Sequence, residues 1–138
     1  MDFNDCIEFA KSTRTCYMAT VDKDQPHVRP IGMWFADQAG FYFQTETVKS
    51  LDKQLRANKK VELCFYGGQP PKTMRVTGQI EFLSDAELKS KVIKERGFLK
   101  GLDNIVSIFR MAKGEAFFWT MADNMKEAQI ERIKFGGA

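Results

Sequence analysis

Short segments typical of β-strands recur along this chain, and turn residues separate most of them. Runs such as Asp22-Lys23-Asp24-Gln25-Pro26 and Asp37-Gln38-Ala39-Gly40 favour tight turns, which join neighbouring strands in opposite directions. The sequence therefore predicts a mainly β fold with an antiparallel sheet of six or seven strands. The unpaired edges of such a sheet must be hidden, which predicts its closure into a barrel. The expected strands are residues 15–21, 27–36, 41–46, 61–66, 74–82, 115–121 and 126–135.

Four short helices are expected between these strands. Asn4 is the expected N-cap of the first, and Ser84 with Glu87 three residues later has the spacing of a capping box. Gly78 falls in the middle of an expected strand and predicts a bulge or a sharp bend there. The helices are expected over residues 5–11, from the corner at residues 45–50 to Asn58, over residues 84–96, and over residues 104–111.

Composition restricts the possible classes of protein. The chain has 138 residues, of which 43% are hydrophobic and 28% charged, which suits one globular domain over residues 1–138. A net charge of +3 without a basic block gives no reason to expect nucleic acid as a partner. No apolar run approaches the roughly 18 residues of a membrane helix. We expect a cytoplasmic protein.

The cysteines and the histidine argue against a metal site. Three cysteines are an odd number without metal-ligand spacing, so Cys6, Cys16 and Cys64 are expected to be reduced thiols. His27 is the single histidine, which excludes a site built from several histidines. No metal is therefore expected.

The corner at residues 45–50 has the features of an anion site. Threonines precede Lys49 and Ser50 where a helix is expected to begin, and unpaired N–H groups at a helix N-terminus favour anions. A lysine at a helix start opposes the helix dipole, which favours the anion-site interpretation. The alternative is a solvated first turn. Arg29, in the second expected strand, is either a ligand-binding residue or a structural ion-pair residue.

Several segments in this order resemble the pyridoxamine 5′-phosphate oxidase-like flavoproteins, which share the FMN-binding split barrel. Within that group the chain is most similar to the small branch related to nitroimidazole-resistance proteins. The resemblance covers nearly the whole chain. It is carried by Ala19-Thr20, Gln25-Pro26-His27-Val28-Arg29-Pro30, Phe41-Tyr42-Phe43-Gln44-Thr45, Lys49 with Gln54-Leu55 and Asn58, Val61-Glu62-Leu63 and the strand over residues 75–82.

The resemblance implies an FMN site at the interface of a homodimer. Lys49 and Ser50 would hold the phosphate, and the backbone from Arg29 to Gly32 would follow the edge of the flavin ring. The implied cofactor-binding residues are Arg29, Pro30, Ile31, Gly32, Gln44, Thr45, Lys49, Ser50 and Gln54, with Arg75 and Trp119 from the second subunit.

Three classes of function remain open at this stage. The first is an FMN-dependent oxidoreductase that acts on a small, flat substrate; its catalytic residues are not identified. The second is a flavin-binding or electron-transfer module without a substrate. The third is a split barrel that uses another cofactor, such as a deazaflavin or haem. True pyridoxamine phosphate oxidase activity is not expected, because nothing after Lys134 matches the basic C-terminal region of those enzymes.

Overall fold

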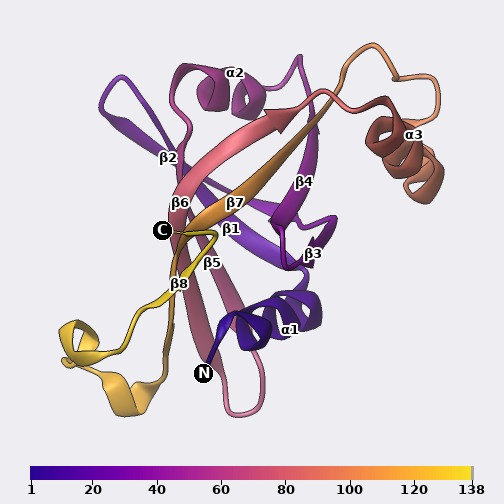
Figure 1. The fold of residues 1–138 in the computed structure, drawn as a ribbon. Helices are drawn as coiled ribbons and strands as arrows, with labels where there is room; N and C mark the ends of the chain where they lie inside the picture. Colours follow the sequence, from indigo (N-terminus) through magenta and orange to yellow (C-terminus); the bar gives the residue numbers. More distant parts are fainter. Residues whose placement is uncertain (138) are drawn as a thin grey trace.

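The structure is a computed structural model that describes residues 1–137, and it confirms the antiparallel split-barrel fold (Figure 1). Eight strands form one sheet instead of the expected six or seven. The strands are β1 (Thr15–Asp22), β2 (Gln25–Gly32), β3 (Phe35–Asp37), β4 (Gly40–Glu46), β5 (Lys60–Gly67), β6 (Lys72–Leu83), β7 (Val106–Trp119) and β8 (Ile133–Phe135). The helices are α1 (Phe3–Thr13), α2 (Ser50–Ala57) and α3 (Ala86–Glu95), with 3₁₀ turns η1 (Gly97–Leu99), η2 (Met121–Asp123) and η3 (Glu127–Gln129).

The barrel is open on one side. The strands pair in the order β2-β1-β5-β6-β7-β4-β3, and β8 pairs with β7. Within residues 1–137, no strand pairs with the outer edge of β2. The edge of β4 opposite β7 is also free beyond the three residues that β3 covers. A slot therefore remains between β2 and the second half of β4.

A crossing of the chain at Met33 and Trp34 creates this slot. The backbone N–H of Met33 donates to the carbonyl of Arg14 at 2.9 Å, and that of Trp34 donates to the carbonyl of Tyr42 at 2.9 Å. The expected single strand over residues 27–36 is thus wrong. After Gly32 the chain stops pairing with β1 and crosses the opening to β4. The carbonyls of Arg14 and Tyr42 accept its hydrogen bonds on the way.

The barrel interior holds the main core. Inward and outward residues alternate along β1 and β5, as period-two patterning predicts, and Leu63 and Phe65 are fully buried. Helix α1 covers one end of the barrel with Cys6 and Ala10 buried. The ring of Phe3 stacks on Phe135 from β8, with centroids 4.4 Å apart, and so ties the two ends of the chain together.

Helix α3 packs outside the barrel against a second, smaller cluster. Val92 is buried there with Trp34, Tyr42 and Leu99. The indole N–H of Trp34 also donates to Glu95 at 3.0 Å, which fixes the C-terminal end of α3 beside the crossing point. None of the helices described in residues 1–137 is long and apolar enough to span a membrane.

Two expected elements near the C-terminus are wrong. Residues 104–111 are expected as a helix, but β7 begins at Val106 and pairs with both β4 and β6. Residues 106, 107, 108 and 109 are all buried, so this run carries no alternation by which a strand could be recognised. The expected strand over residues 126–135 is limited to β8, because η3 occupies its first part.

Two helix starts also differ from expectation. Asp2, not Asn4, caps α1, and its capping box with Asp5 begins the helix at Phe3. Asp85, not Ser84, caps α3: its Oδ1 accepts from the N–H of Glu87 at 2.8 Å. In both helices the observed cap is an aspartate, whose carboxylate also suits the positive end of the helix dipole.

Strands β6 and β7 leave no room for a side chain where two glycines face each other. Gly78 pairs with Gly114, and the register shifts between Gln79 and Glu81, so the bulge expected near Gly78 lies just beyond it. A Cβ added at Gly114 would lie 2.2 Å from the carbonyl oxygen of Thr77. Side chains are therefore excluded from this contact.

Replacement of Gly114 by alanine is expected to lower the free energy of unfolding by about 1–3 kcal/mol, since the strands must separate to admit the methyl group. Urea unfolding would measure the loss as a lower midpoint with an unchanged slope. Gly97→Ala is the matched control, because a Cβ at Gly97 meets nothing within 4 Å. Equal midpoints for the two variants would contradict the packing argument.

Candidate functional site

A cavity of about 430 Å³ occupies the slot between β2 and β4. The first turn of α2 borders it on one side, and the chain leaving α3 borders it on the other. Both strands present unpaired backbone edges here, so N–H and C=O groups are available to a ligand. The lining residues are Arg29, Pro30, Ile31, Gly32, Gln44, Thr45, Glu46, Lys49, Leu51, Arg96 and Phe98.

The cavity brings together most of the residues that the sequence predicts for a cofactor site. Seven of the eleven line it: Arg29, Pro30, Ile31, Gly32, Gln44, Thr45 and Lys49. Ser50 and Gln54 lie on α2 but outside the lining, and Gln54 contacts Arg29. Arg75 and Trp119 belong to β6 and β7 and lie elsewhere on the molecule.

Arg29 lies on the inner face of β2, where Met18 is its partner in β1. Its Nη1 donates to the carbonyl of Met18 at 3.2 Å and to the hydroxyl of Thr20 at 2.9 Å. Its Nη2 donates to the side-chain oxygen of Gln54. All three acceptors are neutral, so Arg29 keeps its full charge beside the cavity.

Arg96 is a second cation of the cavity, and the sequence did not reveal it. Its Nη1 donates to the side-chain oxygen of Gln44, and its Nη2 donates to the carbonyl of Met33 at 3.0 Å. The residue directly follows α3, so its position depends on how that helix packs. The one available signal was its place before Gly97 at the end of an expected helix.

Partial burial lowers the pKa of both arginines. Desolvation is the cause at Arg29, and at Arg96 it is the largest cause, with repulsion from Arg14 in second place. Arginine titrates far above neutral pH, so both side chains stay charged there. Their charge is nevertheless less well hydrated than that of a surface arginine, which strengthens their attraction for an anion.

Glu46 is a second charged residue of the cavity that the sequence did not reveal. It is buried, accepts from the amide of Gln44 at 2.8 Å, and pairs with Lys49 at 3.0 Å. Glu46 is the last residue of β4 and belongs to the corner at residues 45–50. Arg29, Lys49 and Arg96 against Glu46 leave the cavity with a formal surplus of two positive charges.

Lys49 is placed at the start of α2, as expected. It occupies the N-cap position with extended backbone, and no side-chain bond caps the helix. Its side chain is 59% exposed, so it can turn from Glu46 towards a ligand. Ser50 is the first residue of the helix and is exposed.

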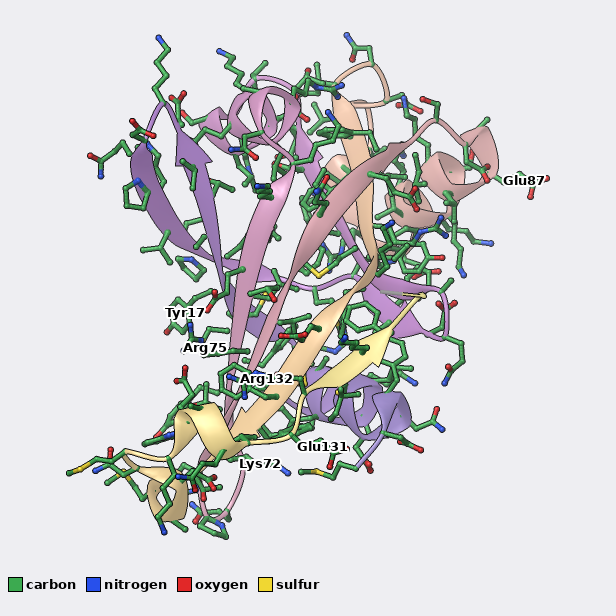
Figure 2. All side chains as sticks on the ribbon, turned by 60° about the vertical axis from the view of Figure 1, so that its left-hand side comes forward. Tyr17, Lys72, Arg75, Glu87, Glu131 and Arg132 are labelled. Atoms are coloured by element: carbon green, nitrogen blue, oxygen red, sulfur yellow. The ribbon has the colours of Figure 1, made fainter. Side chains whose placement is uncertain are left out.

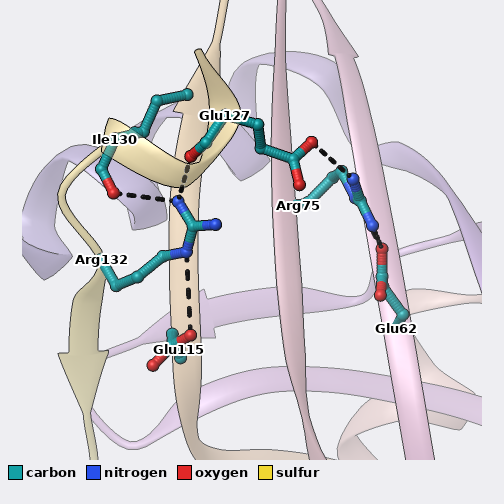
Figure 3. A network of polar contacts seen from close by, with 6 residues as sticks. All are labelled: Glu62, Arg75, Glu115, Glu127, Ile130 and Arg132. Atoms are coloured by element: carbon teal, nitrogen blue, oxygen red, sulfur yellow. Dashed lines mark hydrogen bonds and ion pairs between the residues drawn. The ribbon is translucent and has the colours of Figure 1, made fainter. Parts of the chain in front are cut away.

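Arg75 lies on the outer face of the sheet, in a network with the C-terminal segment (Figure 3). Its Nε donates to Glu62 at 2.6 Å, and its Nη1 pairs with Glu127 at 3.2 Å. The guanidinium of Arg132 lies 4.0 Å from the centre of the Phe117 ring on the same face. Carboxylates therefore neutralise Arg75, unlike the arginines of the cavity.

The charge of the cavity and its free strand edges together suit a particular kind of ligand. The cations suit a phosphate, the strand edges suit a ring that carries donors and acceptors, and Ile31, Leu51 and Phe98 provide apolar contact. A half-open antiparallel barrel with such a slot is a split barrel.

Comparison with known proteins identifies the family. The family model for pyridoxamine 5′-phosphate oxidase matches residues 5–124, which include every element from α1 to η2 except the first residues of α1. The chain belongs to this family. Its members are typically flavin-binding proteins, which agrees with the resemblance seen in the sequence.

The curated relatives match only part of their own length. A pyridoxine/pyridoxamine 5′-phosphate oxidase of Brucella anthropi is 35% identical over 71 residues, which are 51% of this chain and 35% of that protein. A solved NimC/NimA family protein of Clostridium acetobutylicum is 26% identical with a TM-score of 0.78. That alignment covers 96% of this chain and 92% of the other.

More distant solved structures share the fold and differ in their cofactors. A FAD-binding protein of Mesorhizobium loti is 22% identical, with a TM-score of 0.64, over 81% of this chain and 89% of that chain. The haem storage protein HutZ of Vibrio cholerae is 16% identical, with a TM-score of 0.63, over 81% and 90%. The shared fold therefore does not by itself specify a ligand.

Glu46→Gln is expected to strengthen the binding of anions in the slot, because it removes the one carboxylate there and frees Lys49. We expect a gain of about 1 kcal/mol, roughly fivefold, as for a partly exposed charge pair. Calorimetric titration with inorganic pyrophosphate would measure it, and Glu8→Gln on the exposed face of α1 is the control. Weaker binding by Glu46→Gln would mean that the carboxylate organises the site instead.

Proposed function

We propose that this chain binds FMN in the slot and is an FMN-dependent oxidoreductase for a small, flat substrate. One observation carries the proposal: a cavity with two surplus positive charges lies between two free strand edges. A phosphate monoester carries close to two negative charges at neutral pH. The charge of the slot therefore matches that of the FMN phosphate.

Each part of FMN has a counterpart among the residues of the slot. Lys49 and Ser50 would hold the phosphate at the start of α2, where N–H groups lack partners within the helix. Gln44 and Thr45 would line the ribityl chain, whose hydroxyls need both donors and acceptors. The backbone over residues 29–32 would follow the edge of the flavin ring.

The protein groups have binding and orienting roles in this proposal. Bound FMN supplies hydride transfer, which needs no acid–base triad from the chain. Phe98 is 70% exposed at the cavity and offers a flat apolar surface to a substrate. Arg96 adds a positive charge at the same side of the slot. His27 does not line the cavity, so no proton-transfer role is assigned to it.

The alternatives use the same slot. An electron-transfer module would bind FMN through the same residues, and only turnover with a reductant separates it from an oxidoreductase. Haem usually needs an axial His, Cys, Met or Tyr ligand, and the residues that line this cavity include none of these. A deazaflavin cofactor lacks any observation of its own in its favour.

A homodimer would bring further residues to the slot. On the outer face of the sheet, Tyr17 lies between Pro30 of β2 and Cys64 of β5, and Cys64 pairs with Arg75 of β6. Figure 2 shows Tyr17, Arg75 and Arg132 along this face. Tyr17, Val28 and Tyr66 expose 51%, 68% and 61% of their surface, which favours burial against a second copy. Arg75 and Trp119 would then reach the partner's slot from this face.

FMN is expected to bind at least tenfold more tightly than riboflavin, which lacks the phosphate. Quenching of flavin fluorescence in parallel titrations with FMN, FAD, riboflavin and haem would measure the preference. Equal dissociation constants for FMN and riboflavin would overturn the phosphate assignment, and preferential binding of haem would overturn the choice of cofactor. The rate at which the FMN-loaded protein oxidises a reductant in the presence of a nitroaromatic acceptor would separate the two classes. Turnover indicates an enzyme, and its absence indicates a binding module.

Lys49→Ala is expected to weaken FMN by about 1.5 kcal/mol, roughly tenfold, and to leave riboflavin unchanged. This is the lower end for a charge-assisted contact, because Lys49 is exposed and pairs with Glu46 in the free protein. Lys53→Ala, an exposed lysine on the same helix, is the control. An unchanged FMN affinity would place the phosphate nearer to Arg29 or Arg96.

The protein is expected to be a dimer at micromolar concentration, with an interface of about 1,600 Å² or more. The double variant Tyr17→Glu and Val28→Glu should shift it towards monomer, because each copy would bury two carboxylates. Light scattering reports the mass, and FMN titration of the variant reports whether the slot needs the partner. A monomeric unmodified protein would contradict the assignment.

A further inference from the structure

Six of the seven arginines divide into two groups according to what holds them, whereas the side chain of Arg14 forms neither a hydrogen bond nor an ion pair within residues 1–137. Four arginines outside the slot each pair with a carboxylate: Arg56 with Asp52, Arg75 with Glu62 and Glu127, Arg110 with Glu81, and Arg132 with Glu115. None of the ion pairs formed within residues 1–137 includes Arg29 or Arg96. Each of these two instead donates to a glutamine side chain and a backbone carbonyl.

Gln54 is central to the arrangement around Arg29. Its Oε1 accepts from Nη2 of Arg29 and from the hydroxyl of Thr20, the latter at 2.7 Å. The hydroxyl of Thr20 in turn accepts from Nη1 of Arg29 at 2.9 Å. Because a guanidinium can only donate, the oxygen of the Gln54 amide must face it. Thr20 is 1% exposed, so the triangle is anchored in the core.

We propose that Gln54 is a positioning residue that holds Arg29 at the slot without neutralising it, so that its charge acts on the bound flavin. The inference rests on the proposed FMN site. Gln54 itself lies outside the cavity lining, so its effect on the ligand passes through Arg29.

A glutamate at this position would be the better partner by ordinary stability criteria. Its carboxylate would accept the same two hydrogen bonds and add an ion pair with a partly buried guanidinium. It would also cancel the positive charge that an anionic ligand needs. Gln44 stands in the same relation to Arg96, which indicates that neutral acceptors are a shared property of the slot.

Two substitutions at residue 54 separate positioning from structure. Gln54→Glu keeps the hydrogen bonds from Arg29 and Thr20 but neutralises the positive charge of Arg29. Gln54→Met removes the acceptor, keeps a side chain of similar volume and leaves the charge of Arg29 unpaired. A structural role predicts that Gln54→Met is the more harmful change. A positioning role predicts that Gln54→Glu is the more harmful change for FMN, although its ligand-free form is at least as stable as the unmodified protein.

The experiment measures FMN and riboflavin affinity, the reduction potential of the bound flavin, and thermal unfolding of the ligand-free protein. Gln54→Glu should weaken FMN at least tenfold and shift the potential to more negative values, since a positive charge near the ring stabilises the anionic reduced flavin. Gln54→Met should weaken FMN less than Gln54→Glu does. Gln38→Glu, the same chemical change in the exposed β3–β4 turn, loses only a contact with Asn4 and should match the unmodified protein in FMN affinity and reduction potential.

The outcomes distinguish this inference from the function on which it rests. If the unmodified protein does not bind FMN in the same titration, the proposed function fails, and the inference fails with it. If the unmodified protein binds FMN while Gln54→Glu retains its affinity and potential, only the positioning role is overturned. A loss in Gln54→Met that exceeds the loss in Gln54→Glu would show a structural role instead.

Discussion

The slot depends on the backbone crossing at Met33 and Trp34. If β2 continued as one strand past Gly32, nothing would carry the chain across the opening to β4. The two hydrogen bonds of the crossing attach it to the carbonyls of Arg14 and Tyr42, on opposite sides of the opening. The same segment holds Arg96 through the carbonyl of Met33, so the opening and its second cation have one origin.

The groups that hold the arginines differ between the two faces of the sheet. On the outer face, Arg75 and Arg132 pair with the carboxylates of Glu62, Glu127 and Glu115, and this network ties η3 and β8 to β6 and β7 (Figure 3). Inside the slot, amide and carbonyl oxygens hold the arginines. Because neutral acceptors satisfy hydrogen bonds without cancelling charge, the slot remains positive while its polar groups stay bonded.

Sequence patterns predicted the elements that local residues determine. The alternation in residues 61–66 and the turn residues around Gly40 gave β5 and the β3–β4 hairpin correctly. These patterns failed where contacts between residues far apart in the sequence determine the structure. Residues 106–109 are buried on both faces between β4 and β6, so their strand cannot be distinguished from a helix by periodicity. Arg96 joins the slot only because Trp34 and Glu95 fix the end of α3. Neither contact has a local signature.

The two free strand edges have a consequence for how the molecule behaves in solution. An unpaired edge is a template on which another chain can add a strand, and sheet proteins must block such edges. In β2, Pro26 and Pro30 block part of the edge, because proline has no backbone N–H with which a further strand could pair. On β4 no proline follows Gly40 before α2, so a ligand in the proposed site would be what covers that edge. Occupancy of the slot and resistance to aggregation are thus properties of one surface.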